Sequence, residues 1–472
     1  MCKEKNKLFA EKRNFYWNNI IRNSQGNSKK LWSALNKVLC RDFVNNSSVG
    51  ETNHSAQLFA NFVHDKVEKV KETTEGAGDP SFCFVEFDVD KRFSSFFKCS
   101  QLDVRSVVMN SPTKTCILDV IPTGVFKNYV DIFLPYLTDL INSCFSTGCF
   151  PVGCKRAVVT PILKKQFLDI NDLKNYRPVS NLPFVSKLIE RIVVKQLLKH
   201  LVSNNLMPCH QSGYRQFHST ETLLLQIMSD LFNASDIKHA SLLALLDMSS
   251  AFDCVVHSTL LRRLTESYGI SGVVEIWFRS YFNNRTQQIL YRDKYSEIEN
   301  VLTGVPQGSV LGPVLFLLYT ADVFKIIENF NFKGYAFADD MQIVSSAPVV
   351  LFDDMASRLI DCLVSVDNWM AQNGLRMNQC KTQMLPVGTW QQTSKIGFSS
   401  IKIHDLNIEF CSSATNLGFT FDTNMYFHDH VRSLVSSCAF QLRQLRSVKA
   451  VEQKHIVYSG SLLCSFTLGL LQ

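Results

Sequence analysis

The stretch YAFADDMQIV at residues 335–344 sets two aspartates side by side inside a run that is otherwise almost wholly apolar. If Asp339 and Asp340 both ionise about 5 Å apart at an effective dielectric of about 20, they repel by roughly 3 kcal/mol before desolvation is counted. Apolar segments on both sides of two acids are typical of two short strands joined by a tight turn. We therefore predict a hairpin that presents both carboxylates at its tip.

A third acid, Asp247, ends the strand-like run ASLLALLD at residues 240–247. If this run and the hairpin belong to one sheet, three carboxylates converge at its edge. Hard divalent cations such as Mg²⁺ prefer oxygen ligands and would offset the repulsion. Two such ions about 3.5 to 4 Å apart can stabilise the attacking and leaving oxygens of an in-line phosphoryl transfer. An Asp-Asp dipeptide alone is more often a turn or a helix start.

The rest of the sequence indicates a globular protein of mixed structure. With 472 residues, 46% of them hydrophobic and 19% charged, the chain can bury a sizeable core and form two or three domains. We expect helices at 184–205, at 308–327 after a loop, and at 355–374, where Gly374 ends the helix. Between residues 101 and 145 we expect short helices broken by Pro112, Pro122 and Pro135. Because no regular βαβ rhythm appears, the predicted fold class is α+β.

Composition also bounds the compartment. The fifteen cysteines form no CxxC pair, so we expect free thiols rather than a metal or disulfide framework. The charged N-terminus lacks a secretory signal, and the uncharged stretch at 301–321 is too rich in glycine and proline for a lipid span. We expect a soluble intracellular protein of the cytoplasm or nucleus, with no membrane partner.

Charge is concentrated at one end of the chain. Residues 1–42 carry ten Lys or Arg and three acids, which accounts for the whole formal excess of +7. Phe15, Tyr16, Trp17 and Trp32 are interleaved with these cations, a composition that can bind a phosphate backbone. An amphipathic helix with a solvated basic face explains the same pattern equally well. Polar, breaker-rich segments at 45–55 and 71–81 are predicted linkers.

Four motifs of the chain resemble those of reverse transcriptases. LLALLDMSSAFDCVVHSTLLRRL, GVPQGSVLGPVLFLLYTADV, YAFADD and NGLRMNQCKT follow one another in the order and spacing of reverse transcriptase motifs A, B, C and D. Upstream, NDLKNYRPVSNLPFVSKLIERIV and HQSGYRQFHSTETLLLQI resemble the fingers motifs of non-LTR (LINE-type) retrotransposon polymerases. Downstream, ATNLGFTFDTNMYFHDHV resembles their palm-to-thumb segment. The likeness covers residues 100–447.

The resemblance implies a right-hand polymerase of fingers, palm and partial thumb, preceded by a largely helical N-terminal extension. We expect a basic extension at 1–70, a helical pre-fingers region at 82–145, fingers and palm at 146–400, and a palm–thumb connection with a truncated thumb at 401–472. The implied reaction is RNA-templated addition of dNTPs to the 3′-OH of a DNA primer, with two Mg²⁺ ions for which Mn²⁺ can substitute. Full elements carry an endonuclease ahead of the polymerase, and we expect none in this chain, so that nicking of a target would need help in trans.

By resemblance, the metal ligands are Asp247 and Asp339, with Asp340 beside them and the Met248 carbonyl as a further ligand. Phe252 corresponds to the aromatic residue that crowds a ribose 2′-OH, although a plain core aromatic is the alternative. Gln307 and Gly308 correspond to the motif B loop that cradles the incoming nucleotide.

The resemblance also assigns cations. Arg177 and Lys164 correspond to the fingers residues that bind the triphosphate, and the choice between Lys164 and Lys165 stays open. Lys381 corresponds to the motif D lysine that protonates pyrophosphate. Arg215 corresponds to a template contact, for which a structural turn is an equally good alternative.

Two rival functions remain. One is a catalytically inactive remnant that at most binds nucleic acid. The other is an RNA-copying RNA polymerase, and Phe252 argues against it.

Overall fold

The computed structural model describes residues 54–446 except 83–84, 86, 89–90, 166–167, 379 and 405, together with Glu4, Lys5, Leu8, Lys12, Phe15, Tyr16 and Asn19. Most of the basic segment at 1–42, and residues 447–472 of the predicted truncated thumb, therefore lie outside the described residues. The chain divides into two compact units, one of residues 54–412 and one that comprises residues 1–53 and 413–472. Each unit is described by itself.

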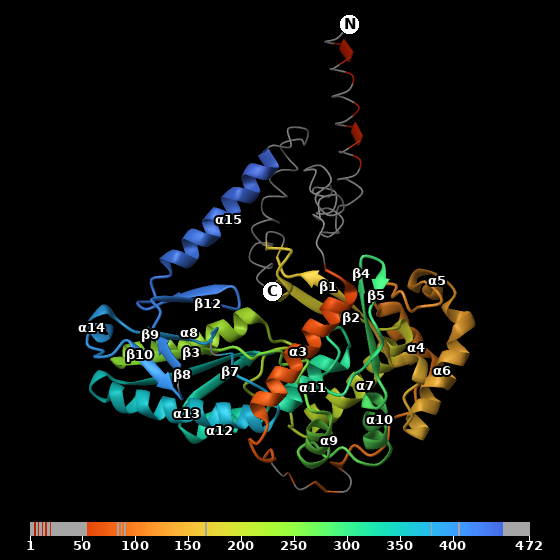
Figure 1. Ribbon diagram of the computed structural model, residues 1–472, viewed down its shortest axis with the longest axis horizontal. Coiled ribbons are helices and arrows are strands. Elements are labelled where there is room, and N and C mark those ends of the chain that lie inside the picture. The colour runs from red at the N-terminus through yellow and green to blue at the C-terminus, as the bar shows by residue number, and fades with distance from the viewer. Residues whose placement is uncertain are drawn as a thin grey trace. The chain divides into compact units, whose positions relative to one another are not determined.

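Helices and mostly antiparallel strands alternate irregularly in the unit of residues 54–412, which confirms the α+β class (Figure 1). The helices are α3 (Ala56–Thr74), α4 (Gln101–Asn110), α5 (Thr123–Asn128), α6 (Val130–Thr147), α7 (Phe184–Ser203), α8 (Thr220–Asp236), α9 (His257–Glu266), α10 (Gly272–Phe282), α11 (Leu311–Thr320), α12 (Val323–Asn329), α13 (Phe352–Gln372) and α14 (Trp390–Thr393). The strands are β1 (Arg156–Leu163), β2 (Tyr176–Asn181), β3 (His239–Leu246), β4 (Thr286–Tyr291), β5 (Lys294–Tyr295), β6 (Glu299–Asn300), β7 (Lys333–Phe337), β8 (Asp340–Pro348), β9 (Gln383–Val387), β10 (Ser400–Ile403) and β11 (Leu406–Glu409).

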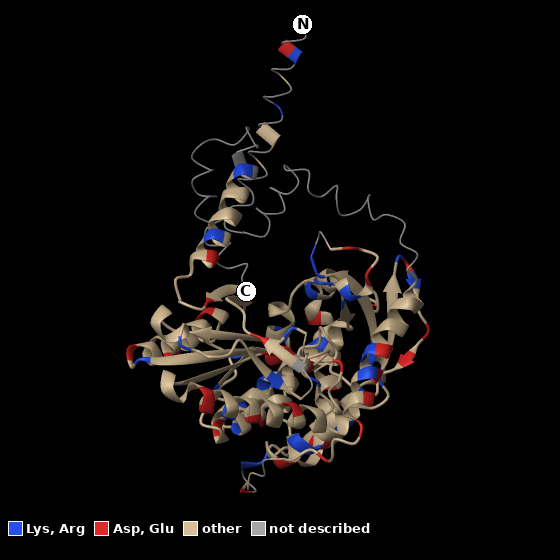
Figure 2. Ribbon diagram, turned by 60° about the vertical axis from the view of Figure 1, so that its left-hand side comes forward, with Lys and Arg blue, Asp and Glu red and all other residues tan. Residues whose placement is uncertain are grey.

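A four-stranded antiparallel sheet in the order β7-β8-β3-β9 forms the centre of this unit. Both predicted strand segments, 240–247 and the hairpin within 335–344, lie in it. All β3 residues except His239 are buried, so both faces of that strand are covered. Helix α8 packs on β3, β7 and β8, and α13 packs on β8. The strands β3 and β9 contain no Lys, Arg, Asp or Glu, and Figure 2 shows the charged residues mainly on surrounding helices and loops.

A second sheet has the order β2-β1-β4-β5, with β6 paired to β4. Strand β1 runs antiparallel to β2 and parallel to β4. Helix α3 packs across β4, where Phe59 joins Val159 and Ile289 in a small core and meets the ring of Tyr176 at a centroid distance of 5.0 Å. This contact fixes α3 beside the sheet.

The predicted helices at 184–205 and 355–374 are confirmed as α7 and α13. The stretch at 308–327 does run from a loop into a helix, but it is divided into two helices, α11 and α12, by a turn at Ala321 and Asp322. Helix α13 ends at Gln372, and Gly374 follows in the left-handed conformation with φ of +64°. The expected break at Pro135 is wrong, because this proline lies inside α6. The proline removes one backbone hydrogen bond of the helix. The helix continues through it because the continuous helix buries Leu134, Leu137 and Ile141 in the main core.

The described part of the other unit contains the hairpin of β12 (Ser413–Asn416) and β13 (Phe419–Asp422), followed by α15 (His428–Arg446). Among the described residues, no helix is long and apolar enough to cross a membrane. In both units, the cysteines that the structure describes are free thiols, for example Cys154, Cys362 and Cys438.

Candidate active site

The strand register brings the three predicted acids together. Strands β3 and β8 pair Leu246 with Met341, so the next step along β3 places Asp247 opposite Asp340. Strands β7 and β8 pair Phe337 with Asp340, which leaves Asp339 in the two-residue loop between them. The backbone register therefore places all three acids at one end of the sheet.

The carboxylates repel one another. Burial, and then the neighbouring Asp339 and Asp247, raise the pKa of Asp340 to about 6. Burial first, and then repulsion by Asp247, also raise the pKa of Asp339, although Arg177 opposes this rise. Both shifts have the causes expected for a cluster of acids that lacks enough positive charge.

A lysine supplies part of that charge. The Lys381 Nζ donates a hydrogen bond to Oδ2 of Asp247 at 3.0 Å. The segment that carries Lys381 is tied to the end of β3, because the Asn378 N–H donates to the Asp247 carbonyl at 2.7 Å and Met377 forms a bridge with Met248. The motif D and motif A segments of the sequence thus lie side by side.

The acids offer the hard oxygen donors that Mg²⁺ prefers. Across the part of the chain that the structure describes, no three His, Cys, Asp or Glu side chains are grouped so that they could hold a metal ion. One oxygen of Asp247 instead accepts the hydrogen bond from Lys381. The carboxylate oxygens are therefore suitable ligands for a divalent cation. In this structure, however, the ammonium group of Lys381 neutralises Asp247.

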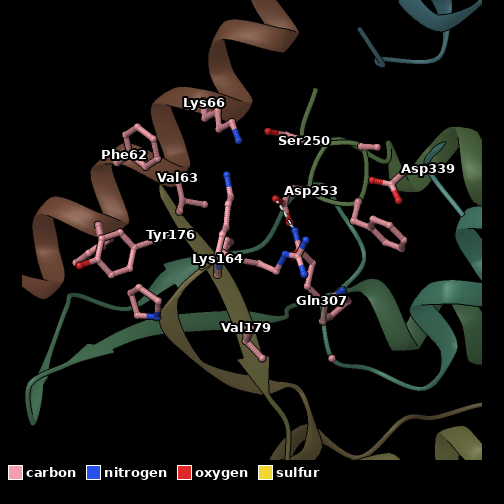
Figure 3. Close-up of a pocket in the computed structure, with 18 of the residues that line it drawn as sticks. Phe62, Val63, Lys66, Lys164, Tyr176, Val179, Ser250, Asp253, Gln307 and Asp339 are labelled. Atoms are coloured by element: carbon pink, nitrogen blue, oxygen red, sulfur yellow. Dashed lines mark hydrogen bonds between the residues drawn. The ribbon is translucent and has the colours of Figure 1, made fainter. Parts of the chain in front are cut away.

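A pocket of about 470 Å³ opens beside the acids (Figure 3). Its lining includes Asp339 from the hairpin, Phe252 and Asp253 after β3, the loop at 306–308, and side chains of β1, β2 and α3. Helix α3, the sheet that contains β1 and β2, and the loops at the end of the central sheet therefore enclose one space.

Cations from three segments line this pocket: Lys164 directly after β1, Arg177 from β2 and Lys66 from α3. Burial, followed by repulsion from Lys66, Lys381 and Arg177, lowers the pKa of Lys164. Its Nζ donates to the Lys174 carbonyl at 2.6 Å. Of the two lysines left open by the sequence, Lys164 is the one that lines the pocket.

Lys66 was missed by the sequence reasoning. In Figure 3 its side chain and that of Lys164 approach each other across the pocket. It belongs to a helix with several lysines, so no local pattern distinguishes it.

Phe252 lies in the wall of the pocket with its ring stacked on Phe316, at a centroid distance of 4.4 Å and an interplanar angle of 24°. The contact comes from α11, so motifs A and B of the sequence meet at this ring. A side chain held in this way is rigid enough to present a fixed surface to a ligand.

The loop before α11 is held by backbone and side-chain contacts. Its Gln307 carbonyl accepts from the Ser180 N–H at 2.8 Å, and the Gln307 Nε2 donates to both oxygens of Asp253 at 3.0 and 2.9 Å. Gly308 has a φ of +130°, and a Cβ there would lie 2.4 Å from the Ser180 carbonyl oxygen. Glycine is thus required at position 308 because the backbone of this loop lies so close to strand β2.

Asp253 was also missed by the sequence reasoning. Burial raises its pKa to about 6, and the hydrogen bonds from Gln307 oppose the rise. An acid within the otherwise apolar AFDCVV segment was the available signal.

Arg215 lies apart from the pocket lining. Its Nη1 donates to the carbonyls of Pro208 and Cys209 at 3.0 and 3.4 Å, which closes the loop at 208–215. These hydrogen bonds match the structural turn that we gave as the alternative role of Arg215. A contact between Arg215 and the template stays a prediction.

Comparison with known proteins agrees with this geometry. The sequence profile described as reverse transcriptase (RNA-dependent DNA polymerase) matches residues 162–421. A probable RNA-directed DNA polymerase from transposon BS of Drosophila melanogaster is 28% identical over 336 residues, covering 68% of this chain and 36% of that protein. The corresponding protein from transposon X-element of the same species is 25% identical and covers 84% and 42%. The RNA-directed DNA polymerase from its mobile element jockey is 24% identical and covers 70% and 36%.

The chain thus spans well under half the length of these three relatives. The profile match nevertheless takes in more than half of the chain and contains every one of the predicted site residues. On this match, together with the acids gathered at one sheet edge, the chain belongs to the reverse transcriptase family.

Proposed function

We propose that this chain is the RNA-directed DNA polymerase of a non-LTR retrotransposon, which adds dNTPs to a DNA 3′-OH on an RNA template. The observation that carries the proposal is the meeting of Asp247, Asp339 and Asp340 at one sheet edge, beside a pocket lined by cations. Carboxylates that gather divalent ions, next to a site that attracts phosphates, are what phosphoryl transfer needs.

In this proposal the β7-β8-β3-β9 sheet is the palm, the sheet that contains β1 and β2 belongs to the fingers, and α15 begins a partial thumb. The proposed regions keep the bounds 1–70, 82–145, 146–400 and 401–472. Helix α3 runs past the first of these limits and lines the pocket, which supports a functional connection between the extension and the polymerase.

Two Mg²⁺ ions would be held by Asp247 and Asp339, with Asp340 and the Met248 carbonyl as further ligands. When bound, they would lower the barrier to attack by the primer hydroxyl and to departure of pyrophosphate. Lys381 would turn from Asp247 toward the leaving group and donate a proton there.

The other pocket residues would bind and select the nucleotide. Arg177 and Lys164 would contact the triphosphate, since their positive charges face the same space as Asp339. Phe252 would exclude a ribose 2′-OH, Gln307 and Gly308 would form the wall against the base pair, and Arg215 would contact the template backbone. An RNA template, a DNA primer and dNTPs are the proposed partners.

Primer extension tests this function. The chain is incubated with an RNA template annealed to a DNA primer, dNTPs and either Mg²⁺ or Mn²⁺, alongside Asp339→Ala. Metal-dependent extension by the wild type, abolished in the variant, is the expected result. A folded wild type that extends no primer with either metal would leave the inactive remnant as the better description.

A further inference from the structure

The turn that carries Asp339 contains a residue in an uncommon conformation. The two-residue loop between β7 and β8 consists of Ala338 and Asp339, and Ala338 has a φ of +59°. A positive φ at the first loop residue is usually provided by glycine, because a Cβ crowds the backbone there. Something outside the hairpin must therefore favour this conformation.

The side chain of Gln211 supplies that support. It is 2% exposed, and its Oε1 accepts a hydrogen bond from the Ala338 N–H at 2.9 Å. Its Nε2 donates to the Ala338 carbonyl at 3.1 Å. One amide group thus satisfies both backbone groups of the strained residue, across 127 positions of sequence.

The backbone around Gln211 reinforces the contact. The Ala336 N–H donates to the His210 carbonyl at 3.0 Å, and the Ser212 N–H donates to the Ala336 carbonyl at 2.8 Å. Gln211 and Ala336 of β7 therefore form an isolated parallel bridge, which aligns Gln211 with the turn.

Gly213 permits this close approach. A Cβ at this position would lie 2.4 Å from the backbone nitrogen of Ala338, so no larger residue fits without displacement. The Gly213 N–H also donates to Oε1 of Gln211 at 2.9 Å, which fixes the orientation of the amide.

We propose that Gln211 is a positioning residue that holds the Ala338–Asp339 turn in the conformation that presents Asp339 to the pocket. This inference rests on the proposed polymerase function for its kinetic consequence. The hydrogen bond from the Ala338 N–H to Gln211 can be tested without measuring activity, because its loss would change the exchange rate of the Ala338 amide hydrogen.

The first experiment measures hydrogen exchange at the Ala338 amide in the full chain. Gln211→Met keeps the volume of the side chain but removes both hydrogen bonds, so exchange at Ala338 should accelerate. Gln211→Glu keeps an acceptor for the Ala338 N–H, so the Ala338 amide should stay largely protected from exchange. This variant also provides a second measurement if Gln211→Met folds poorly. Unchanged exchange in Gln211→Met, or equal loss in both variants, would overturn the proposal.

The second experiment measures primer extension as a function of Mg²⁺ concentration. In Gln211→Met we expect kcat to fall by about tenfold or more and the Mg²⁺ requirement to rise, because small displacements of a reacting group can cost on the order of 100-fold in rate. The dNTP KM should change little.

Ala338→Gly provides a rescue. Glycine adopts a positive φ without strain, so the turn needs less support and the loss caused by Gln211→Met should shrink in this background. A loss of equal size in both backgrounds, with an unchanged Mg²⁺ requirement, would show a merely structural role and contradict the proposal.

Gln392→Met is the matched control, since Gln392 is also buried and its Oε1 accepts from the Thr389 N–H at the start of α14. It should leave the Mg²⁺ requirement at its wild-type value. A folded wild type without extension activity would refute the polymerase function, while the exchange measurement would still decide the role of Gln211.

Discussion

Lys381 and Asp247 form an ion pair, with Nζ and Oδ2 3.0 Å apart, at the edge where the three acids meet. The lysine side chain is 65% exposed and that of the aspartate 28% exposed. A pair so open to solvent contributes at most about 1 kcal/mol to stability. Its significance is therefore chemical, because a lysine that neutralises a carboxylate competes with a cation for the same oxygen.

Lys381→Met should separate two effects of this lysine. Loss of the competing ammonium should lower the Mg²⁺ concentration that gives half-maximal extension. Loss of a proton donor should reduce kcat by about 100-fold or more, since general acids typically contribute at least that much. Steady-state extension at a series of Mg²⁺ concentrations measures both.

Lys381→Arg is the control for charge. It keeps a cation beside Asp247, so the Mg²⁺ requirement should stay near the wild-type value, while proton transfer should fail because guanidinium does not deprotonate. If Lys381→Met alters neither the Mg²⁺ requirement nor kcat, the ion pair has no part in the reaction.

The centre of the fold was predictable because its local signals agree with its tertiary arrangement. The apolar run before Asp247 forms a fully buried strand, and the apolar flanks of Asp339 and Asp340 form a hairpin. All three acids lie at the same end of these strands, so placing the strands was enough to bring the acids to one end of the sheet.

Contacts that depend on distant packing were not predictable in the same way. Nothing near Gln211 in the sequence indicates that its amide reaches Ala338, and Lys66 resembles its neighbours on α3. Pro135 illustrates the opposite case, in which a strong local signal is overridden by the burial of a helix face.

Phe252 should control the choice of sugar. Its ring is fixed against Phe316 in the pocket wall, so replacement by valine opens space without removing a charge. We expect Phe252→Val to lower the ratio of dNTP to rNTP incorporation by about tenfold or more, in line with selection by pocket shape. Phe252→Tyr keeps the ring and should preserve the ratio. An unchanged ratio in Phe252→Val would remove the gate assignment.

Asp253 should make stability depend on pH. Its pKa is raised from 3.8 to about 6 by burial, so the folded protein binds this proton more tightly than the unfolded chain. Burial of the charge costs stability at neutral pH, and protonation removes that cost as pH falls from about 6 to about 4.

The free energy of unfolding of the wild type should therefore increase relative to Asp253→Asn over this window, as urea unfolding at pH 7.5 and pH 5 measures. Asp361→Asn, an exposed change on α13, is the control for general charge effects. A difference between wild type and Asp253→Asn that stays constant with pH would show that this carboxyl does not titrate there.

Lys66 should contribute to nucleotide binding from outside the matched family region. Its side chain lines the same pocket as Lys164 and Arg177, and its charge lowers the pKa of Lys164. We expect Lys66→Ala to raise the dNTP KM by about tenfold at low salt, since a charge-assisted contact contributes about 1.5 to 3 kcal/mol. Lys69 is an exposed lysine on the same helix, and Lys69→Ala should leave KM unchanged. The effect of Lys66→Ala should also diminish as salt screens the pocket. Equal KM values for the two variants at low salt would show that α3 encloses the pocket without binding its ligand.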